Sequence, residues 1–258
     1  MTTHATPTLR KIITEANRGE KIIPVIRAYL YDPNFPSFEV KVKGSSQRAP
    51  DGWFHPSTHP TWGERQLWYY LYMPEVLVNE PLDPLGAMAT TAGNFWHSFI
   101  SVIGIESGIL KAVDVPVQDD DTGARGEMDG ETVDEGFEFK TMNELKLSRL
   151  PKQAGPEDPE VLEWLRQKCP QYYGQVQEYM RLSNYTSFRM VILHTGYPFD
   201  MREIRVLRDE KFINEVREKY LRVRQAVADQ VMPQPCCGAR SEMSRQCPAK
   251  EACPIALI

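Results

Sequence analysis

The chain has 258 residues, of which 41% are hydrophobic and 25% are charged, an ordinary composition for a soluble globular protein of one large domain or one domain with appended pieces. Its formal net charge of −5 argues against a surface coated in positive charge, although it does not exclude a local basic groove. No apolar run is long enough for a membrane span, and the first residues lack the apolar stretch of a signal peptide. We therefore expect a cytoplasmic protein.

The first part of the chain predicts a few elements separated by loops. Residues 7–17 predict a helix, residues 38–43 a strand, and residues 44–60, rich in proline, glycine and serine, a loop. The aromatic run 62–72 predicts a helix. Residues 85–103 predict another, because apolar side chains recur there at four-residue spacing.

The middle of the chain predicts strands. Residues 105–117 predict one strand, and two short extended runs at 124–130 and 136–142 predict a β-hairpin. Residues 158–184 predict a helix that Pro170 breaks into two pieces.

Two further strands are predicted at 187–195 and 201–207, around a Gly-Tyr-Pro turn, and a long charged helix at 209–231. From residue 85 to residue 207 the order is helix, three strands, helix, strand, strand. This order predicts an α/β fold with a central mixed β-sheet flanked by helices.

One carboxylate–lysine pattern differs from the rest. Four triplets in the chain have an acid two residues before a lysine, but only Glu138-Phe139-Lys140 follows another acid, Asp129, on a neighbouring predicted strand. Because side chains alternate along a strand, Glu138 and Lys140 should share one face while Phe137 and Phe139 anchor the other face in the core. If the hairpin pairs as expected, Asp129 lies near Glu138.

Two close carboxylates repel each other, and a divalent cation with oxygen ligands relieves that repulsion. Mg²⁺ or Mn²⁺ held by Asp129 and Glu138 can neutralise a phosphate and generate a hydroxide-like nucleophile. Lys140 can orient or deprotonate the attacking water and offset developing negative charge. Taken alone, the pattern is equally typical of a surface hairpin with an ordinary Glu–Lys pair.

Residues on the flanking helices add to this pattern. Gly93-Asn94-Phe95-Trp96-His97 lies on the predicted helix before the strands, and Gln175-Val176-Gln177-Glu178-Tyr179 lies on the helix after them. Taken in order, these segments and the strand residues resemble the motif set of RecB-like nucleases, a branch of the PD-(D/E)xK superfamily. That branch includes AddB-type and CRISPR-associated exonucleases and many phage exonucleases. The resemblance covers roughly residues 62–207, together with the cysteine-rich tail.

The resemblance implies a restriction-endonuclease-like core and metal-dependent hydrolysis of DNA, more often as an exonuclease. It implies that His97 is a ligand of a second metal ion, that Gln175 steadies the metal site and that Tyr179 touches a phosphate. Glu127 shares a strand face with Asp129 and is a weaker candidate for assisting it. Outside this context, a lone histidine on an amphipathic helix is more typical of a packed residue.

Four of the five cysteines fall in the last 23 residues, which favours a metal or iron–sulfur site over disulfides in a reducing compartment. Cys247 and Cys253 resemble the last two ligands of the four-iron–four-sulfur cluster of those exonucleases. The chain departs from that pattern because no cysteine precedes Cys169 and Ser244 stands where a third cysteine is expected.

Other ligands could complete such a site. Cys236 and Cys237 could supply the missing thiolates for an iron–sulfur cluster or for Zn²⁺, or His55 or His59 could replace one of them. A tail of free thiols is the third alternative.

We expect an N-terminal region over residues 1–61, the nuclease domain over 62–231 and the cysteine-rich tail over 232–258. The expected partner is DNA, as single strands or duplex ends, and recombination proteins or a second copy of the chain are further candidates. No membrane is expected, and no nucleotide cofactor, because the chain has no Gly-rich phosphate loop. The alternative is a non-catalytic DNA- or protein-binding module, or a subunit of a recombination complex, with a nuclease-like fold.

Overall fold

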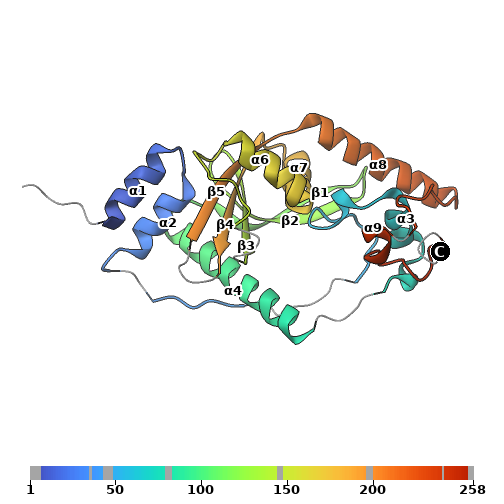
Figure 1. The fold of residues 1–258 in the computed structure, drawn as a ribbon, viewed down its shortest axis with the longest axis horizontal. Coiled ribbons are helices and arrows are strands. Elements are labelled where there is room, and N and C mark those ends of the chain that lie inside the picture. Colours follow the sequence, from blue (N-terminus) through green and yellow to red (C-terminus); the bar gives the residue numbers. More distant parts are fainter. Residues whose placement is uncertain are drawn as a thin grey trace, which may run out of the picture.

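The structure is a computed structural model and describes residues 7–34, 37–42, 49–78, 83–143, 148–195, 200–239 and 241–254. Its centre is a five-stranded sheet in the order β1-β2-β3-β4-β5 (Figure 1). Strands β3 and β4 are parallel, and the other neighbouring pairs are antiparallel, so the sheet is mixed as the sequence predicts. The strands are β1 (Ala112–Asp119), β2 (Ala124–Glu131), β3 (Gly136–Met142), β4 (Ser187–His194) and β5 (Asp200–Leu207).

Helices cover both faces of this sheet. Figure 1 shows α1 and α2 at one end of the molecule and α3, α8 and α9 at the other. None of the helices that the structure describes is long and apolar enough to span a lipid bilayer. The helices are α1 (Pro7–Asn17), α2 (Ile22–Leu30), α3 (Glu64–Tyr72), α4 (Pro84–Glu106), α6 (Pro159–Lys168), α7 (Pro170–Ser183), α8 (Glu210–Ala228) and α9 (Glu242–Arg245), with two 3₁₀ turns at His59–Thr61 and Pro74–Val76.

The apolar side chains form three clusters. One face of the sheet packs on α2 and α4 through residues such as Ile26, Ile103 and Phe137. The other face packs on α6 and α7, and β4 is buried along its whole length because it is covered on both faces. The third cluster joins α3 and α8 to the C-terminal segment, where Cys247 is buried. The predicted α/β fold with a mixed sheet between helices is confirmed.

Most predicted elements are confirmed, with three differences. The helix predicted to end at residue 103 continues to Glu106, so the next strand begins at Ala112 and not at residue 105. Residues 38–42 form no strand, while residues 43–48 and the turn 196–199 lie outside the described residues. Helix α2 was not predicted because Pro24 and β-branched residues fill it, although proline is tolerated in the first turn of a helix.

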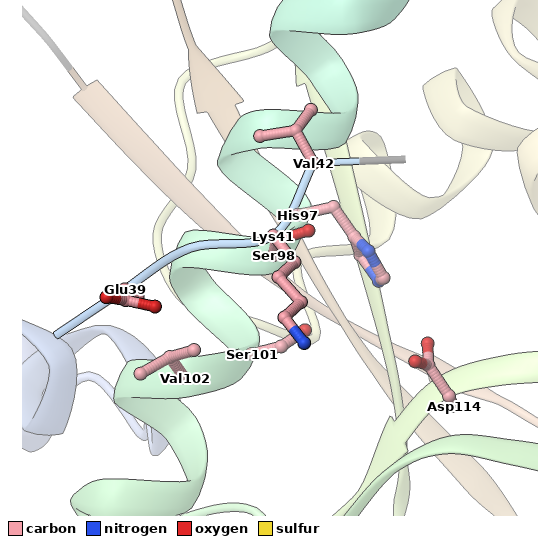
Figure 2. A pocket seen from close by; sticks show the side chains of 8 residues that line it. All are labelled: Glu39, Lys41, Val42, His97, Ser98, Ser101, Val102 and Asp114. Atoms are coloured by element: carbon pink, nitrogen blue, oxygen red, sulfur yellow. The ribbon is translucent and has the colours of Figure 1, made fainter. Parts of the chain in front are cut away.

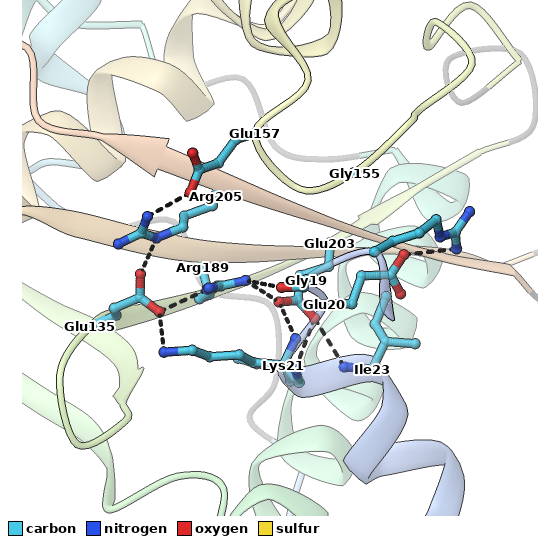
Figure 3. A network of polar contacts seen from close by, with 12 residues as sticks. Gly19, Glu20, Lys21, Ile23, Glu135, Gly155, Glu157, Arg189, Glu203 and Arg205 are labelled. Atoms are coloured by element: carbon cyan, nitrogen blue, oxygen red, sulfur yellow. Dashed lines mark hydrogen bonds and ion pairs between the residues drawn. The ribbon is translucent and has the colours of Figure 1, made fainter. Parts of the chain in front are cut away.

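A buried network of charges attaches α2 to the sheet (Figure 3). The Glu203 carboxylate on β5 accepts hydrogen bonds from the backbone N–H groups of Lys21, Ile22 and Ile23 at 2.9, 2.8 and 3.1 Å. These are donors that the first turn of a helix leaves unpaired, and a carboxylate there also interacts favourably with the helix dipole. Arg189 on β4 links Glu203, at 2.8 Å, to Glu135 in the β2–β3 turn, at 2.7 Å.

This network predicts a dependence of stability on pH. Burial acts to raise the pKa of Glu135, but Arg189, Arg205 and Ser187 together lower it from 4.5 to about 2. The charged carboxylate therefore stabilises the folded protein fully above its unfolded pKa, and this contribution is lost as the pH falls through about 2. Urea denaturation across this acidic range should show a falling free energy of unfolding, and Glu135→Gln should be less stable at neutral pH with a weaker pH dependence.

The matched control is Glu218→Gln, which removes an exposed ion pair with Arg217 on α8. Exposed pairs contribute about 0–1 kcal/mol, so this variant should resemble the wild type. An unchanged pH dependence in Glu135→Gln would contradict the assignment of the acid transition to Glu135.

Candidate active site

The site lies where β2 and β3 separate. Among the described residues these strands pair at only two positions, Gly130 with Phe137 and Glu131 with Gly136. Beyond them, the Asp129 carboxylate accepts a hydrogen bond of 2.8 Å from the backbone N–H of Phe139. The Asp129 carboxylate thus supplies the acceptor that a paired β2 residue would otherwise supply, and the bond fixes Asp129 against β3.

Because side chains alternate along β3, Glu138 and Lys140 share one face of the strand, as the sequence predicts. Phe137 and Phe139 are buried in the cluster with α2 and α4. The Glu138 carboxylate is fully buried and forms an ion pair with the Lys140 ammonium. On α7, the Gln175 amide donates a hydrogen bond of 2.8 Å to Oε1 of Glu138. Oε2 of Glu138 is buried and has no hydrogen-bond partner among the residues that the structure describes.

His97 on α4 completes the group. Its Nε2 atom lies 3.2 Å from Oδ1 of Asp129. Burial acts to lower the pKa of His97, but the Asp129 carboxylate raises it above its ordinary value. Burial acts to raise the pKa of Asp129, but His97 and Lys140 hold it below its usual range. The two residues therefore stabilise each other's charged forms.

The second pair behaves differently. Burial and the nearby Asp129 carboxylate raise the pKa of Glu138 to about 7. Burial acts to lower the pKa of Lys140, but Glu138 and Asp129 raise it above its ordinary value, so Lys140 is protonated. A carboxylate that is buried, crowded by a second carboxylate and short of one hydrogen-bond donor favours a cation at this position.

The groups open into a cleft of about 480 Å³ between α4, the separated strands and α7. The side of α4 that faces it carries small and polar residues, from Ala89 through Thr90 and Gly93 to His97. The opposite side includes Tyr172 on α7, whose ring centroid lies 5.4 Å from Nζ of Lys140. The cleft is thus large enough for a phosphate with part of its substituents to reach His97, Asp129 and Lys140, which line it, whereas the fully buried Glu138 does not line it.

The structure brings together His97, Asp129, Glu138, Lys140 and Gln175, but it places Tyr179 elsewhere. Tyr179 is buried, and its hydroxyl donates a hydrogen bond of 2.7 Å to the carbonyl of Glu127. Its observed contact is therefore with the backbone of β2. Glu127 itself is exposed.

Tyr172 is a cleft residue that the sequence analysis missed. It lies three residues before Gln175 on α7, and residues three or four apart share a helix face. This helical spacing was the signal that could have identified it, once Gln175 was placed at the site.

Within the described residues, no group of three or more histidine, cysteine, aspartate or glutamate side chains is gathered closely enough to hold a metal ion. At the candidate site Asp129 is held by Phe139 and His97, and Glu138 is held by Lys140 and Gln175. The residues still fit a divalent cation, since two carboxylates and an imidazole are suitable donors and one carboxylate oxygen is unpaired.

The four C-terminal cysteines meet around a second, much smaller cavity. Cys236, Cys237, Cys247 and Cys253 line it together with Ser244 and the α3 side chains of Arg65, Gln66 and Tyr69. Burial raises the pKa of Cys236. Cys169 is buried in the core between α6 and α7.

Neither histidine considered as a replacement ligand lines this cavity. His59 accepts a hydrogen bond of 2.7 Å from the backbone N–H of His55 and packs against Trp62 and Tyr70. All four cysteines thus line one cavity that neither histidine lines, although in the described residues they are not gathered closely enough to form a ready metal group.

A comparison with protein-family models finds no matching model, and a comparison with curated protein sequences finds no match. Among solved structures, the chain is similar to the protein SSO0001, with a TM-score of 0.45 and 12% identity over 91% of this chain and 96% of that one.

It is also similar to the alkaline exonuclease LHK-Exo from Laribacter hongkongensis, with a TM-score of 0.46 and 13% identity over 70% of this chain and 91% of that one. A structure of LHK-Exo in complex with dAMP gives a TM-score of 0.46 and 14% identity over 69% and 89%.

The donor types at the candidate site and the unpaired Glu138 oxygen predict that a divalent cation binds there. Asp129→Asn and Glu138→Gln should each weaken Mn²⁺ binding by about 100-fold or more, because each removes a charged donor and even a supporting hydrogen bond contributes about 10- to 100-fold to metal affinity. Isothermal titration calorimetry measures the affinity, and circular dichroism checks the fold. Asp134→Asn, which changes an exposed acid in the same hairpin, is the control and should bind Mn²⁺ like the wild type. A wild-type affinity for Mn²⁺ in both Asp129→Asn and Glu138→Gln would exclude this site.

Proposed function

We propose that the chain is a metal-dependent deoxyribonuclease of the RecB-like PD-(D/E)xK type that hydrolyses phosphodiester bonds, most consistently as an exonuclease. The observation that supports this most strongly is the grouping of Asp129, Glu138 and Lys140 where β2 and β3 separate, with one buried oxygen of Glu138 unpaired. His97 and Gln175 adjoin the same group from two different helices, as the motif order implies.

Asp129, Glu138 and His97 would hold Mg²⁺ or Mn²⁺, which when bound supplies charge neutralisation on the phosphate and a water of lowered pKa. Gln175 orients the Glu138 carboxylate, and the core packing of Phe137 and Phe139 keeps β3 rigid beneath it.

Lys140 is protonated in this arrangement, so it acts as a cation and hydrogen-bond donor. A protonated Lys140 can orient the attacking water as a donor and stabilise negative charge that develops on the phosphate, whereas removal of a proton from water would first require that Lys140 lose its own proton.

The alternative is a non-catalytic DNA- or protein-binding module with the same fold. A surface hairpin with a chance Glu–Lys pair would leave Glu138 exposed, whereas here it is fully buried and bonded to Gln175. A buried ion pair carries a large desolvation cost and is weak evidence for stability alone, so its presence here favours a chemical role.

Cleavage of linear and covalently closed circular DNA, with Mg²⁺, with Mn²⁺ and with EDTA, tests the proposal. Cleavage of linear DNA alone that EDTA abolishes is the expected result for an exonuclease. Lys140→Ala should lower kcat by about 100- to 1,000-fold, the usual effect of removing one donor to developing charge, while DNA affinity measured with Ca²⁺ changes little.

Lys111→Ala is the control for Lys140→Ala, because Lys111 is an exposed lysine paired with Glu131 away from the cleft. Normal kcat in Lys140→Ala would contradict the role of Lys140. DNA binding without cleavage under every metal condition would favour the binding module.

The cysteine cavity is proposed as a separate, structural site for Zn²⁺ or a four-iron–four-sulfur cluster. Its four thiols come from one short segment that also packs on α3, and Nη1 of Arg65 lies 4.0 Å from Sγ of Cys253. The Arg65 guanidinium would thus lie next to the negative charge of a metal ion bound by thiolates. A short polar segment buries little apolar surface, so metal binding would contribute much of its folding free energy.

Cys247→Ser and Cys253→Ser should lose the metal and lower the melting temperature, with cleavage reduced only indirectly. Elemental analysis of anaerobically purified protein, together with a thiol titration, measures this. Cys169→Ala is the control, since that cysteine is buried away from the cavity and should keep the metal. Freely reacting thiols with neither iron nor zinc would exclude the site.

A further inference from the structure

A second large cavity lies beside the reaction centre. It has a volume of about 520 Å³ and is lined by Glu39, Lys41, Val42, His97, Ser98, Ser101, Val102 and Asp114 (Figure 2). His97 belongs to the walls of both this cavity and the cleft that contains Asp129 and Lys140. A ligand that runs from the cleft into the cavity must therefore pass the candidate catalytic groups.

Three separate parts of the chain build this cavity. The segment that contains Glu39 and Lys41 crosses α4, helix α4 supplies His97 and the serines, and β1 supplies Asp114 (Figure 2). Asp114 has φ 51°, a left-handed conformation that is uncommon for a residue in a strand, and lies between the paired positions Val113 and Val115. Oγ of Ser101 is buried and has no hydrogen-bond partner in the described part of the chain.

The lining offers one cation, two hydroxyls and two carboxylates that can bind different parts of a nucleotide. The Lys41 ammonium can bind a phosphate as a point charge, and the hydroxyls of Ser98 and Ser101 can donate or accept hydrogen bonds. The carboxylates of Glu39 and Asp114 can accept hydrogen bonds from sugar hydroxyls or from exocyclic base amines.

Val42 and Val102 supply apolar surface for the face of a base or sugar. The volume lies within the range of about 300–1,000 Å³ that is typical of small-molecule sites, which suits one unpaired nucleotide and not a duplex.

We propose that this cavity is a subsite for a single unpaired nucleotide next to the bond that is cleaved, with Lys41 as the residue that binds its phosphate. The link to cleavage rests on the proposed nuclease function, whereas binding of the nucleotide does not. The substrate at this site is then a single-stranded end or an unpaired stretch of DNA, since a base-paired residue cannot enter a cavity of this size.

The test uses deoxythymidine 3′,5′-bisphosphate and the full chain in EDTA, with binding measured by isothermal titration calorimetry. The wild type should bind the bisphosphate, and Lys41→Ala should weaken binding by about tenfold or more, because it removes a hydrogen bond to a charged group. Ser101→Val should also weaken binding, by a smaller factor. Lys111→Ala removes the same charge from an exposed position outside the cavity and should leave the affinity unchanged.

A wild type that does not bind the bisphosphate, or equal affinities in Lys41→Ala and the wild type, would overturn the proposal. Cleavage of a single-stranded oligonucleotide with Mg²⁺ separates it from the nuclease proposal. A Lys41-dependent affinity without any cleavage supports the subsite while the nuclease function fails. Cleavage with the same KM in Lys41→Ala and the wild type overturns the subsite while the nuclease function stands.

Discussion

The geometry of the candidate site depends on the hydrogen bond that the Asp129 carboxylate accepts from the backbone N–H of Phe139 at 2.8 Å. The two strands pair only beside their turn, so without this bond the Phe139 N–H would lack an acceptor from β2. The bond keeps the strands apart and fixes one carboxylate against the strand that carries Glu138. The separation of the two acids is thus set by backbone positions, which are more rigid than long side chains.

Once the two carboxylates are fixed close together, the surrounding charges must balance them. Lys140 forms an ion pair with Glu138, and Nε2 of His97, whose pKa Asp129 raises, lies 3.2 Å from Oδ1 of Asp129. The balance is incomplete, because Oε2 of Glu138 is buried and finds no donor in the described part of the chain. Burying such an atom costs free energy that a bound cation would offset. The same contacts that satisfy the acids also explain why they do not converge into a ready three-ligand metal group.

The mixed sheet and the shared face of Glu138 and Lys140 could be predicted because alternation along a strand and the order of elements along the chain depend on local sequence, whereas the order of the strands in the sheet was not predicted. The contact of Gln175 with Glu138 could be expected only through the motif resemblance, since it joins residues 37 positions apart. Tyr179 was assigned to the cleft for the same reason, but its contact with the Glu127 carbonyl depends on how α7 packs on β2. Tyr172, and not Tyr179, lines the cleft. Helical spacing alone could not choose between the two tyrosines, because one lies three residues before Gln175 and the other four residues after it.

The N-terminal region also contributes more than its composition suggested. Residues of α2 form part of the core beneath β3, and Phe54 forms a bridge with Ala124 at the start of β2. Lys41 then reaches the cavity beside His97 from a segment without regular structure, whose side-chain positions depend on tertiary contacts. If the proposed subsite binds a nucleotide, this placement reconciles an acidic chain with a nucleic-acid ligand. The net charge governs long-range steering, whereas binding depends on a few cations held close to the phosphate, and these can sit within a protein of net charge −5.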